Sequence, residues 1–291
     1  MKPELFMQLF LKKVALLYFL LFPFILFSQN KPDPLFINHL VGKKMFSEVV
    51  FLLNELPGSP SSCTDSLHYY KGWSLYSLKS LEPSAYEFLK VSPTSPFYNK
   101  SRFFAAYNQM HLGNYPSAKE ILNQLNTLDK ETENLRMFQL AGISLLEKDF
   151  TAFDNLANRI DSSHYILHNE YLKLNSYVDL ITSHRKKSPA VAGILSALIP
   201  GSGKMYVGKT AQGISSLIAV AGFGLVTMEN WKRNGPENFK TILFGAIFTT
   251  FYVGNIYGSV HLSKISENEF QHEYQNKILF NLHIPLRNFF N

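Results

Sequence analysis

Few residues in this chain have a type and spacing suited to chemistry. Gly201-Ser202-Gly203-Lys204 is the first candidate, because a glycine-rich loop that ends in lysine can hold phosphate. A phosphate loop needs a glycine, four residues, Gly-Lys and then Ser or Thr for the magnesium ion. Here Leu198 stands at the first glycine position and Met205 follows the lysine. We therefore reject nucleotide binding at this site.

The sequence also gives no support for a metal site or a catalytic nucleophile. His164 and His168 lie four residues apart on an expected helix, but no third ligand of the right kind follows nearby. Cys63 is the single cysteine, which excludes an internal disulfide and a multi-cysteine metal site. The chain has no H-E-x-x-H, no G-x-S-x-G and no dinucleotide fingerprint. We predict a protein that is not an enzyme and binds no cofactor or metal.

Composition points to lipid rather than nucleic acid as the charged partner. The chain has 291 residues, a net charge of +6 and only 17% charged residues, below the usual quarter. The one dense basic cluster, residues 185–187, lies beside an apolar run. Anionic headgroups are the simplest partner for such a cluster, so we expect contact with the bilayer and no nucleic-acid binding.

The N-terminus has the three zones of a secretory signal peptide. Lysines precede an uncharged run, Val14–Phe27, and a polar stretch begins at Ser28. We predict a signal peptide over residues 1–28 that is cut after Ser28. An uncleaved anchor helix is the alternative, because Leu26 stands where a small residue is preferred.

Residues 31–183 contain a repeat with a period of 34 or 35 residues. Three sets of positions recur at steps of 35, 34 and 35 residues. The sets are Ile37, Gly72, Ala106, Ala141; Phe46, Leu81, Tyr115, Phe150; and Val49, Ser84, Ala118, Phe153. This pattern predicts pairs of helices joined by tight turns, with small residues where the helices cross.

The best copy, Ala106–Leu125, resembles the tetratricopeptide repeat. Gly113 supplies the turn, Tyr115 the groove-filling aromatic residue and Ala118 the small crossing residue. The resemblance covers about 150 residues and implies a solenoid whose concave face binds peptides or proteins. The residues expected to pack the repeats are Gly72, Ala106, Gly113, Tyr115, Ala118, Ala141 and Phe150.

The other copies depart from the family pattern. Lys44, Lys79 and Lys148 stand where Gly113 stands, and Phe153 is large where the family has alanine. Many aromatic residues between Tyr69 and Tyr107 are expected in the inter-helix core, with a peptide groove as the alternative. Residues 165–182 read as one helix that caps the solenoid.

Residues 188–260 read as a membrane module. The uncharged runs 211–228 and 241–260 reach the length that a helix needs to cross about 30 Å of hydrocarbon. The apolar segment 190–199 is too short to span alone. Residues 229–240 are expected to form a polar loop, and residues 261–291 a polar helix and tail.

The string that precedes the first span is similar to a small bacterial module with two transmembrane helices and the motif P-G-x-G-x-x-Y-x-G. Pro200, Gly201, Gly203, Tyr206 and Gly208 match that motif. The resemblance implies a membrane hairpin and no chemistry. Lys204 and Lys209 are expected to reach lipid phosphates from this bend.

Small residues in the spans predict close helix packing. Gly213 opens the first span, and Gly254 and Gly258 form a G-x-x-x-G in the second. Ala219 and Gly222 are their expected mates. Asn255 is expected to form a hydrogen bond across the hairpin; lining a pathway is the alternative.

The fold class predicted is therefore all-α, a degenerate tetratricopeptide-type solenoid followed by a transmembrane hairpin. We expect a non-catalytic scaffold in the bacterial inner membrane, with an unknown protein or peptide on the solenoid. An accessory role in transport or membrane-protein insertion is the alternative. The signal peptide favours a periplasmic solenoid, although loop charges favour the reverse orientation.

Overall fold

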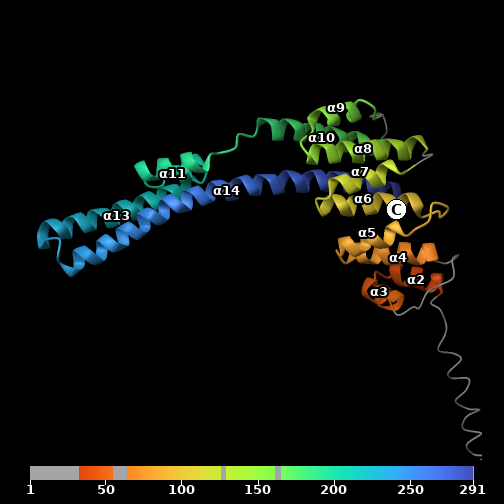
Figure 1. The fold of residues 1–291 in the computed structure, drawn as a ribbon, viewed down its shortest axis with the longest axis horizontal. Helices are drawn as coiled ribbons and strands as arrows, with labels where there is room; N and C mark the ends of the chain where they lie inside the picture. Colours follow the sequence, from red (N-terminus) through yellow and green to blue (C-terminus); the bar gives the residue numbers. More distant parts are fainter. Residues whose placement is uncertain (1–32, 55–63, 126–128, 161–164, 291) are drawn as a thin grey trace, which may run out of the picture. The chain divides into compact units, whose positions relative to one another are not determined.

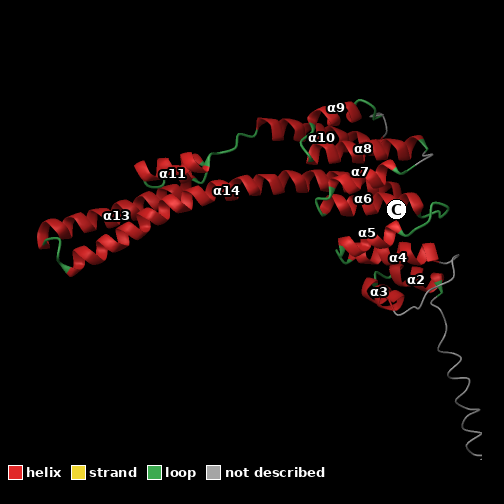
Figure 2. Ribbon diagram, in the orientation of Figure 1, coloured by secondary structure: helices red, strands yellow, loops and turns green. Residues whose placement is uncertain are grey.

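The computed structural model describes residues 33–54, 64–125, 129–160 and 165–290 (Figure 1). Within these ranges every regular element is a helix and no strand is formed (Figure 2). The prediction of an all-α fold is confirmed. The signal peptide predicted for residues 1–28 lies outside the described residues.

Up to residue 160 the described helices follow one another in pairs. The pairs are α2 (Pro34–Gly42) with α3 (Phe46–Asn54), α4 (Thr64–Ser77) with α5 (Leu81–Leu89), α6 (Tyr98–His111) with α7 (Tyr115–Asn123), and α8 (Lys130–Leu146) with α9 (Phe150–Ala157). Each of the three sets of recurring positions is one column of the repeat. The second helix of each pair begins at a residue of the second column: Phe46, Leu81, Tyr115 and Phe150. The 34–35 residue period is therefore the period of one helical pair.

The same tight turn joins the two helices of each pair. At Gly113, the N–H groups of this residue and the next donate back to carbonyls of α6 at 3.1 and 2.9 Å, the pattern of a Schellman motif. The same two bonds recur at Lys44, Lys79 and Lys148. Their φ angles of 59°, 63° and 62° lie in the left-handed region, as does the 75° of Gly113. The turn is thus kept even where lysine replaces glycine.

The first and third repeat columns form the core between helices. Gly72 leaves room for Phe88, since a Cβ at Gly72 would lie 2.8 Å from Cδ1 of that ring. Ser84 Oγ donates to the Gly72 carbonyl at 2.7 Å and accepts from Asn108 Nδ2 at 2.9 Å, so it links α4, α5 and α6. The remaining members of the two columns are also buried: Ile37, Ala106, Ala141, Val49, Ala118 and Phe153.

The second half of the chain contains α10 (Tyr165–Ser183), α11 (Pro189–Leu198), α12 (Ser202–Tyr206), α13 (Thr210–Asn234) and α14 (Phe239–Phe290). Both α13 and α14 are long and apolar enough to cross a membrane. Only 11% of the most apolar window of each helix is buried, so neither is the covered core helix of a soluble domain. This pattern fits membrane association.

The turn between the two spans is shorter than the sequence predicts. Residues 229–234 continue α13 instead of forming a loop, and Glu229 pairs with Arg233 one turn later at 2.9 Å. The helix ends at Asn234, and the next residue, Gly235, has a φ of 83° that favours glycine.

The C-terminal residues continue the second span as one helix. The polar helix and tail expected over residues 261–291 are, as far as residue 290, the second half of α14, which runs unbroken for 52 residues. Its last turns are buried: Tyr274, Ile278, Leu282 and Leu286 are at most 1% exposed. An apolar stripe at helical spacing explains this burial.

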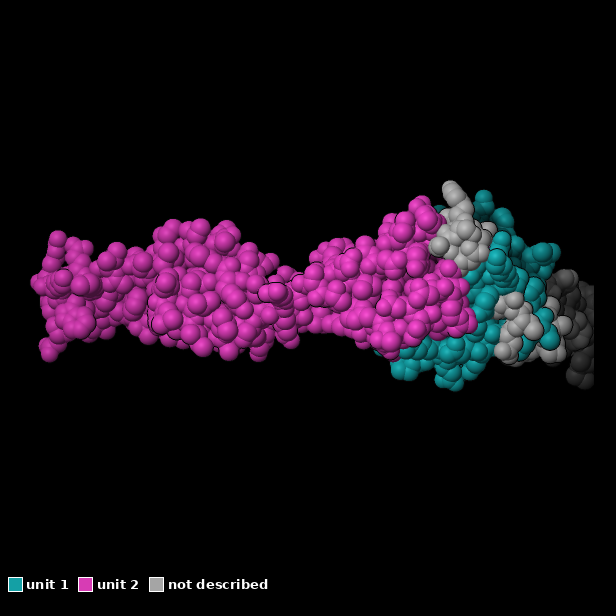
Figure 3. All heavy atoms as spheres, turned by 90° about the horizontal axis from the view of Figure 1, so that it is seen from above, with its two compact units in different colours: residues 1–136, 290 teal, residues 137–289, 291 magenta. Residues whose placement is uncertain are grey.

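The chain divides into two compact units, residues 1–136 with 290 and residues 137–289 with 291 (Figure 3). This division falls inside α8, whereas the sequence places the domain boundary between residues 183 and 188. Contacts of the last turns of α14 with α8 and α10 explain the difference, because they group these helices with α13 and α14.

Candidate functional site

The residues before the first span fold into two short helices, α11 and α12. Ser188 caps α11, its Oγ accepting from the Val191 N–H at 3.4 Å, and Pro189 occupies the first turn, where its missing N–H costs nothing. The 10 residues of α11 match the short segment expected over 190–199. At about 1.5 Å per residue they cannot cross the hydrocarbon layer. Pro200 follows and cannot continue the helix.

The motif glycines allow backbone-to-backbone contact around α12. A Cβ at Gly203 would lie 1.9 Å from the Ala192 carbonyl oxygen of α11. A Cβ at Gly201 would lie 2.0 Å from the carbonyl oxygen of Gly213 in α13, and one at Gly213 would lie 2.5 Å from Met205 Cγ. Any side chain at Gly201 or Gly203 would push these helices apart. The predicted packing role of the three glycines therefore has a direct geometric basis.

Tyr206 and Gly208 fix the far end of the same bend. The Tyr206 hydroxyl accepts from the Ser188 N–H at 3.3 Å, and Lys187 Nζ lies 5.0 Å from the Tyr206 ring centroid. Gly208 has φ of 90° and turns the chain into α13. The aromatic ring thus lies beside one lysine of the basic cluster.

Ser196 connects α11, α12 and α14 through a buried polar network. Its Oγ accepts from the Gly203 N–H at 3.0 Å and lies 2.6 Å from Ser259 Oγ. Asn255 Nδ2 donates to the Ser196 carbonyl at 3.3 Å. The sequence predicts a hydrogen bond of Asn255 across the hairpin; the bond that forms joins α14 to α11 and not to α13. Sequence reasoning missed Ser196 and Ser259, which stand out as small polar residues within uncharged apolar runs.

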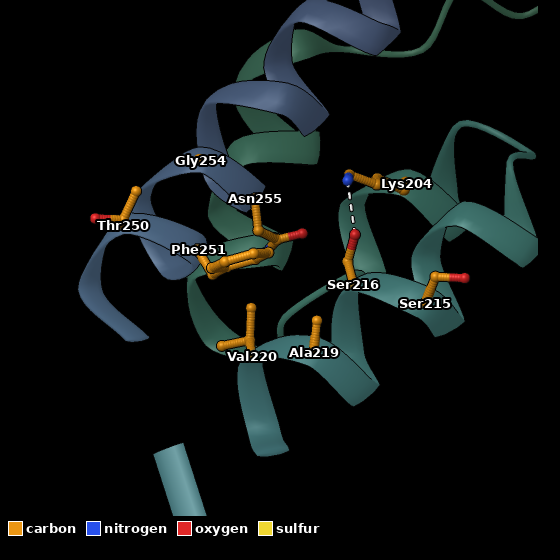
Figure 4. A pocket seen from close by; sticks show the side chains of 9 residues that line it. All are labelled: Lys204, Ser215, Ser216, Ala219, Val220, Thr250, Phe251, Gly254 and Asn255. Carbon is orange, nitrogen blue, oxygen red and sulfur yellow. Dashed lines mark hydrogen bonds between the residues drawn. The ribbon is translucent and has the colours of Figure 1, made fainter. Parts of the chain in front are cut away.

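A pocket of about 430 Å³ opens between α12, α13 and α14 (Figure 4). Its wall is partly apolar and partly made of amine, hydroxyl and amide groups. The lining residues are Lys204, Ser215, Ser216, Ala219, Val220, Thr250, Phe251, Gly254 and Asn255. Two of the predicted packing residues, Gly254 and Asn255, thus line the pocket.

The two glycines of the second span do not form the predicted close contact with α13. A Cβ at Gly254 would have no atom within 4 Å, and one at Gly258 would meet only Lys204 Cε at 3.8 Å. Gly222, their expected mate, is equally open. The spans meet instead through larger groups, with the rings of Phe223 and Phe251 5.0 Å apart. These rings hold the helices apart and leave the pocket.

Lys204 gives this pocket a positive charge that no carboxylate balances. Residues 188–228 and 239–262 contain no Asp or Glu. Within the described part of the chain, Lys204 forms no ion pair, and its Nζ donates to Ser216 Oγ at 2.6 Å. Lys209, the other lysine expected at lipid phosphates, pairs with Glu269 at 3.4 Å. Of these two lysines, Lys204 is therefore the one whose charge no carboxylate of the described residues balances.

The aromatic residues of the repeats lie mainly in the core. Tyr69, Phe103, Phe104 and Tyr107 are buried, and burial raises the pKa of Tyr69 and Tyr107 well above the usual range. The ring of Phe97 stacks on Tyr69 at 4.4 Å. This supports the core interpretation over an aromatic peptide groove.

The described part of unit 1 exposes apolar surface at its first helical pair. A pocket of about 500 Å³ lies between α2 and α3 and is bordered by Phe36, Met45 and Phe51. These three side chains are between 40% and 64% exposed. Exposed apolar patches of this kind are typical of protein-binding surfaces.

Among the described residues, no group of three or more His, Cys, Asp or Glu could hold a metal ion. His168 lies on α10, and His164 lies outside the described residues. Comparisons with protein-family models, curated proteins and solved structures find no match to this chain. The two family resemblances therefore stay predictions.

Proposed function

We propose that this chain is a non-catalytic, membrane-anchored scaffold whose helical repeats bind a protein or peptide. The proposal depends mainly on the two roles of helix α14. One helix is both the second apolar span and a packed element of the region that contains α8 and α10.

Specific contacts hold the end of α14 in place. Leu282 lies against Gly142 of α8 so closely that a Cβ there would be 2.3 Å from Leu282 Cδ2. Gln139 Nε2 donates to the Leu282 carbonyl at 2.8 Å, and Asn281 Nδ2 donates to the Glu170 carbonyl of α10 at 3.0 Å. Apolar packing and hydrogen bonds from two helices therefore act on the same turn of α14.

This arrangement supports a stiff connection rather than a flexible tether. A flexible linker would let α8 and α10 move independently of the apolar first half of α14, whereas a continuous helix holds them within one compact unit.

The apolar surface at Phe36, Met45 and Phe51 is the partner-binding surface in this proposal. A photo-crosslinking residue placed at Phe51 in the full chain, in native membranes, tests it. We expect one recurrent protein adduct at Phe51 and none at the matched exposed position Leu225 in α13, which is 68% exposed. Equal or absent adducts at both positions would count against the proposal.

The location in a bacterial inner membrane with periplasmic repeats is part of the same proposal. It is supported by the signal-like N-terminus and by the two long apolar helices. Reporter fusions at residues 100, 235 and 285 test it. Residues 100 and 285 are expected on the periplasmic side and residue 235 on the cytoplasmic side; the inverse pattern would refute the orientation.

The alternative, an accessory role in transport or membrane-protein insertion, is favoured by one feature, the pocket within the hairpin with Lys204 and Asn255 in its wall. A hairpin with this role would change the insertion of a test membrane protein when the full chain is reconstituted with it. An insertion yield that does not depend on the chain would remove this alternative.

A further inference from the structure

The pocket between α12, α13 and α14 contains a polar atom that the described fold leaves without a partner. Asn255 is 4% exposed, and its Oδ1 is buried and accepts no hydrogen bond from the described residues. A buried acceptor without a hydrogen bond is unfavourable, because it has lost its bonds to water and gained none in return. Its Nδ2 is engaged by Ser196, so the amide cannot simply turn over to satisfy both ends. A bound group with a hydrogen-bond donor would remove the cost.

The opposite side of the pocket offers donors and positive charge. Lys204 Nζ uses one donor on Ser216 Oγ at 2.6 Å and carries two more. Figure 4 shows the amide oxygen of Asn255 turned to the side of the pocket on which Lys204 and Ser216 lie. The site thus combines an anion-binding group with a neutral acceptor a short distance away.

The remaining wall is apolar. Ala219, Val220 and Phe251 continue the pocket along the faces of the two spans. A ligand that fits must carry an anionic group, a neighbouring donor and a hydrocarbon portion.

We propose that this pocket binds a glycerophospholipid headgroup, with the phosphate at Lys204 and an N–H or O–H donor of the headgroup at Asn255 Oδ1. Phosphatidylethanolamine and phosphatidylglycerol have both features. Phosphatidylcholine has the phosphate but no N–H or O–H donor. The inference goes beyond the scaffold function, since the repeats could bind a partner whether or not the hairpin holds a lipid.

The direct test compares two zwitterionic lipids with the same acyl chains on the full chain purified in detergent. Bound phosphatidylethanolamine and phosphatidylcholine are counted by native mass spectrometry during a titration. We expect roughly tenfold tighter retention of phosphatidylethanolamine, the effect of one hydrogen bond to a buried acceptor. Equal retention of the two lipids would overturn the proposal, and this comparison needs no variant.

Matched variants locate the site. Lys204→Gln is expected to weaken binding of both lipids by roughly tenfold, because it removes the charge that meets the phosphate. Lys209→Gln is its control and is expected to change nothing, since Lys209 pairs with Glu269. Equal losses in both variants would indicate general surface attraction and contradict the site.

Gly254→Leu tests the pocket by filling it. No atom lies within 4 Å of a Cβ at Gly254, so the helix accepts the side chain while the pocket loses its space. Gly222→Leu is the control, because Gly222 is equally open but does not line the pocket. Loss of lipid in the first variant alone supports the proposal. Unchanged binding in Gly254→Leu, with normal circular dichroism, would overturn it.

Two further experiments test whether the bound phosphate belongs to a lipid and whether Asn255 Oδ1 accepts the hydrogen bond of the headgroup. Soluble phosphoethanolamine is not expected to displace the lipid at equal concentration, because it lacks the hydrocarbon portion; full displacement would assign the site to a soluble anion.

Asn255→Leu is expected to abolish the preference for phosphatidylethanolamine over phosphatidylcholine. A preference that persists in this variant would rule out Asn255 Oδ1 as the acceptor.

Discussion

At the residue scale, the lysines in the repeat turns have a cost that the fold tolerates. Lys79 has φ of 63°, a conformation that disfavours residues with a Cβ by about 1–2 kcal/mol. We predict that Lys79→Gly raises the free energy of unfolding of the purified chain by about 1 kcal/mol. Thermal unfolding followed by circular dichroism measures the effect.

Lys79→Ala is the control for this prediction, because alanine keeps the Cβ and removes the charged group together with its methylene stem. Its stability is expected to stay near that of the unchanged chain. A gain in Lys79→Ala as large as the gain in Lys79→Gly would show that charge, and not backbone conformation, sets the cost.

Glu87 is a second residue whose effect on stability can be predicted. Burial alone would raise the pKa of its carboxyl group, but hydrogen bonds from His68 and Lys90 and the charge of Lys71 outweigh it and lower the pKa to about 2, from an ordinary 4.5. The folded state therefore holds the proton less tightly than the unfolded state. The resulting stabilisation is complete above pH 4.5 and is lost as the pH falls towards 2.

We predict that Glu87→Gln lowers the free energy of unfolding by about 2 kcal/mol at pH 7 and that this deficit shrinks as the pH falls from 4.5 towards 2. Unfolding curves at pH 7 and pH 3 provide the comparison. Glu82→Gln, an exposed position on the same helix, is expected to show no such change. A deficit that is independent of pH would mean that shape rather than charge is responsible.

At the scale of elements, helix α14 joins two parts of the chain that the sequence presents as separate. Leu282 is fully buried against Gly142. We predict that Leu282→Ala destabilises the chain by about 2–5 kcal/mol, the usual cost of a cavity at a buried leucine. Limited proteolysis is expected to cut the last turns of α14 faster in this variant.

Phe280→Ala is the matched control, because Phe280 lies on the same turn and is 64% exposed. Its proteolysis rate and thermal unfolding are expected to match those of the unchanged chain. If Phe280→Ala and Leu282→Ala had equal effects, the buried contact with α8 would not be what holds α14.

Much of this element structure could be predicted from the sequence, because it depends on local signals. Small residues, turn residues and apolar periodicity mark the start of the second helix in each pair, at Phe46, Leu81, Tyr115 and Phe150. The spans also follow from local composition. The docking of Leu282 could not be predicted, since its contact, Gly142, lies 140 residues earlier in the chain. The polar residues that follow the second span also suggest that the helix ends before Leu282.

The candidate pocket was not predicted from the sequence, which predicts close packing at Gly254 and Gly258 instead. The sequence marks Gly254, Asn255 and Gly258 as special but does not say whether small residues bring helices together or leave space between them. That outcome depends on the Phe223 and Phe251 rings, which hold the spans apart at a neighbouring turn. The partner of Asn255, Ser196, lies on a helix too short to be recognised as part of the hairpin.

At the scale of the whole molecule, the central claim is that α14 lies in lipid along its first half and against protein along its last turns. Cys63 is the single cysteine, so a Cys63→Ser background allows one cysteine to be placed at any position. Val253 and Phe280 are matched probes, because they are 57% and 64% exposed on the same helix. In water, both positions would react equally with a soluble maleimide.

The decisive measurement is maleimide labelling of Val253→Cys and Phe280→Cys in native membranes broken so that both faces are open. The account predicts rapid labelling at residue 280 and protection at residue 253 by the lipid. Equal, rapid labelling at both positions would contradict it, because the first half of α14 would then be in water.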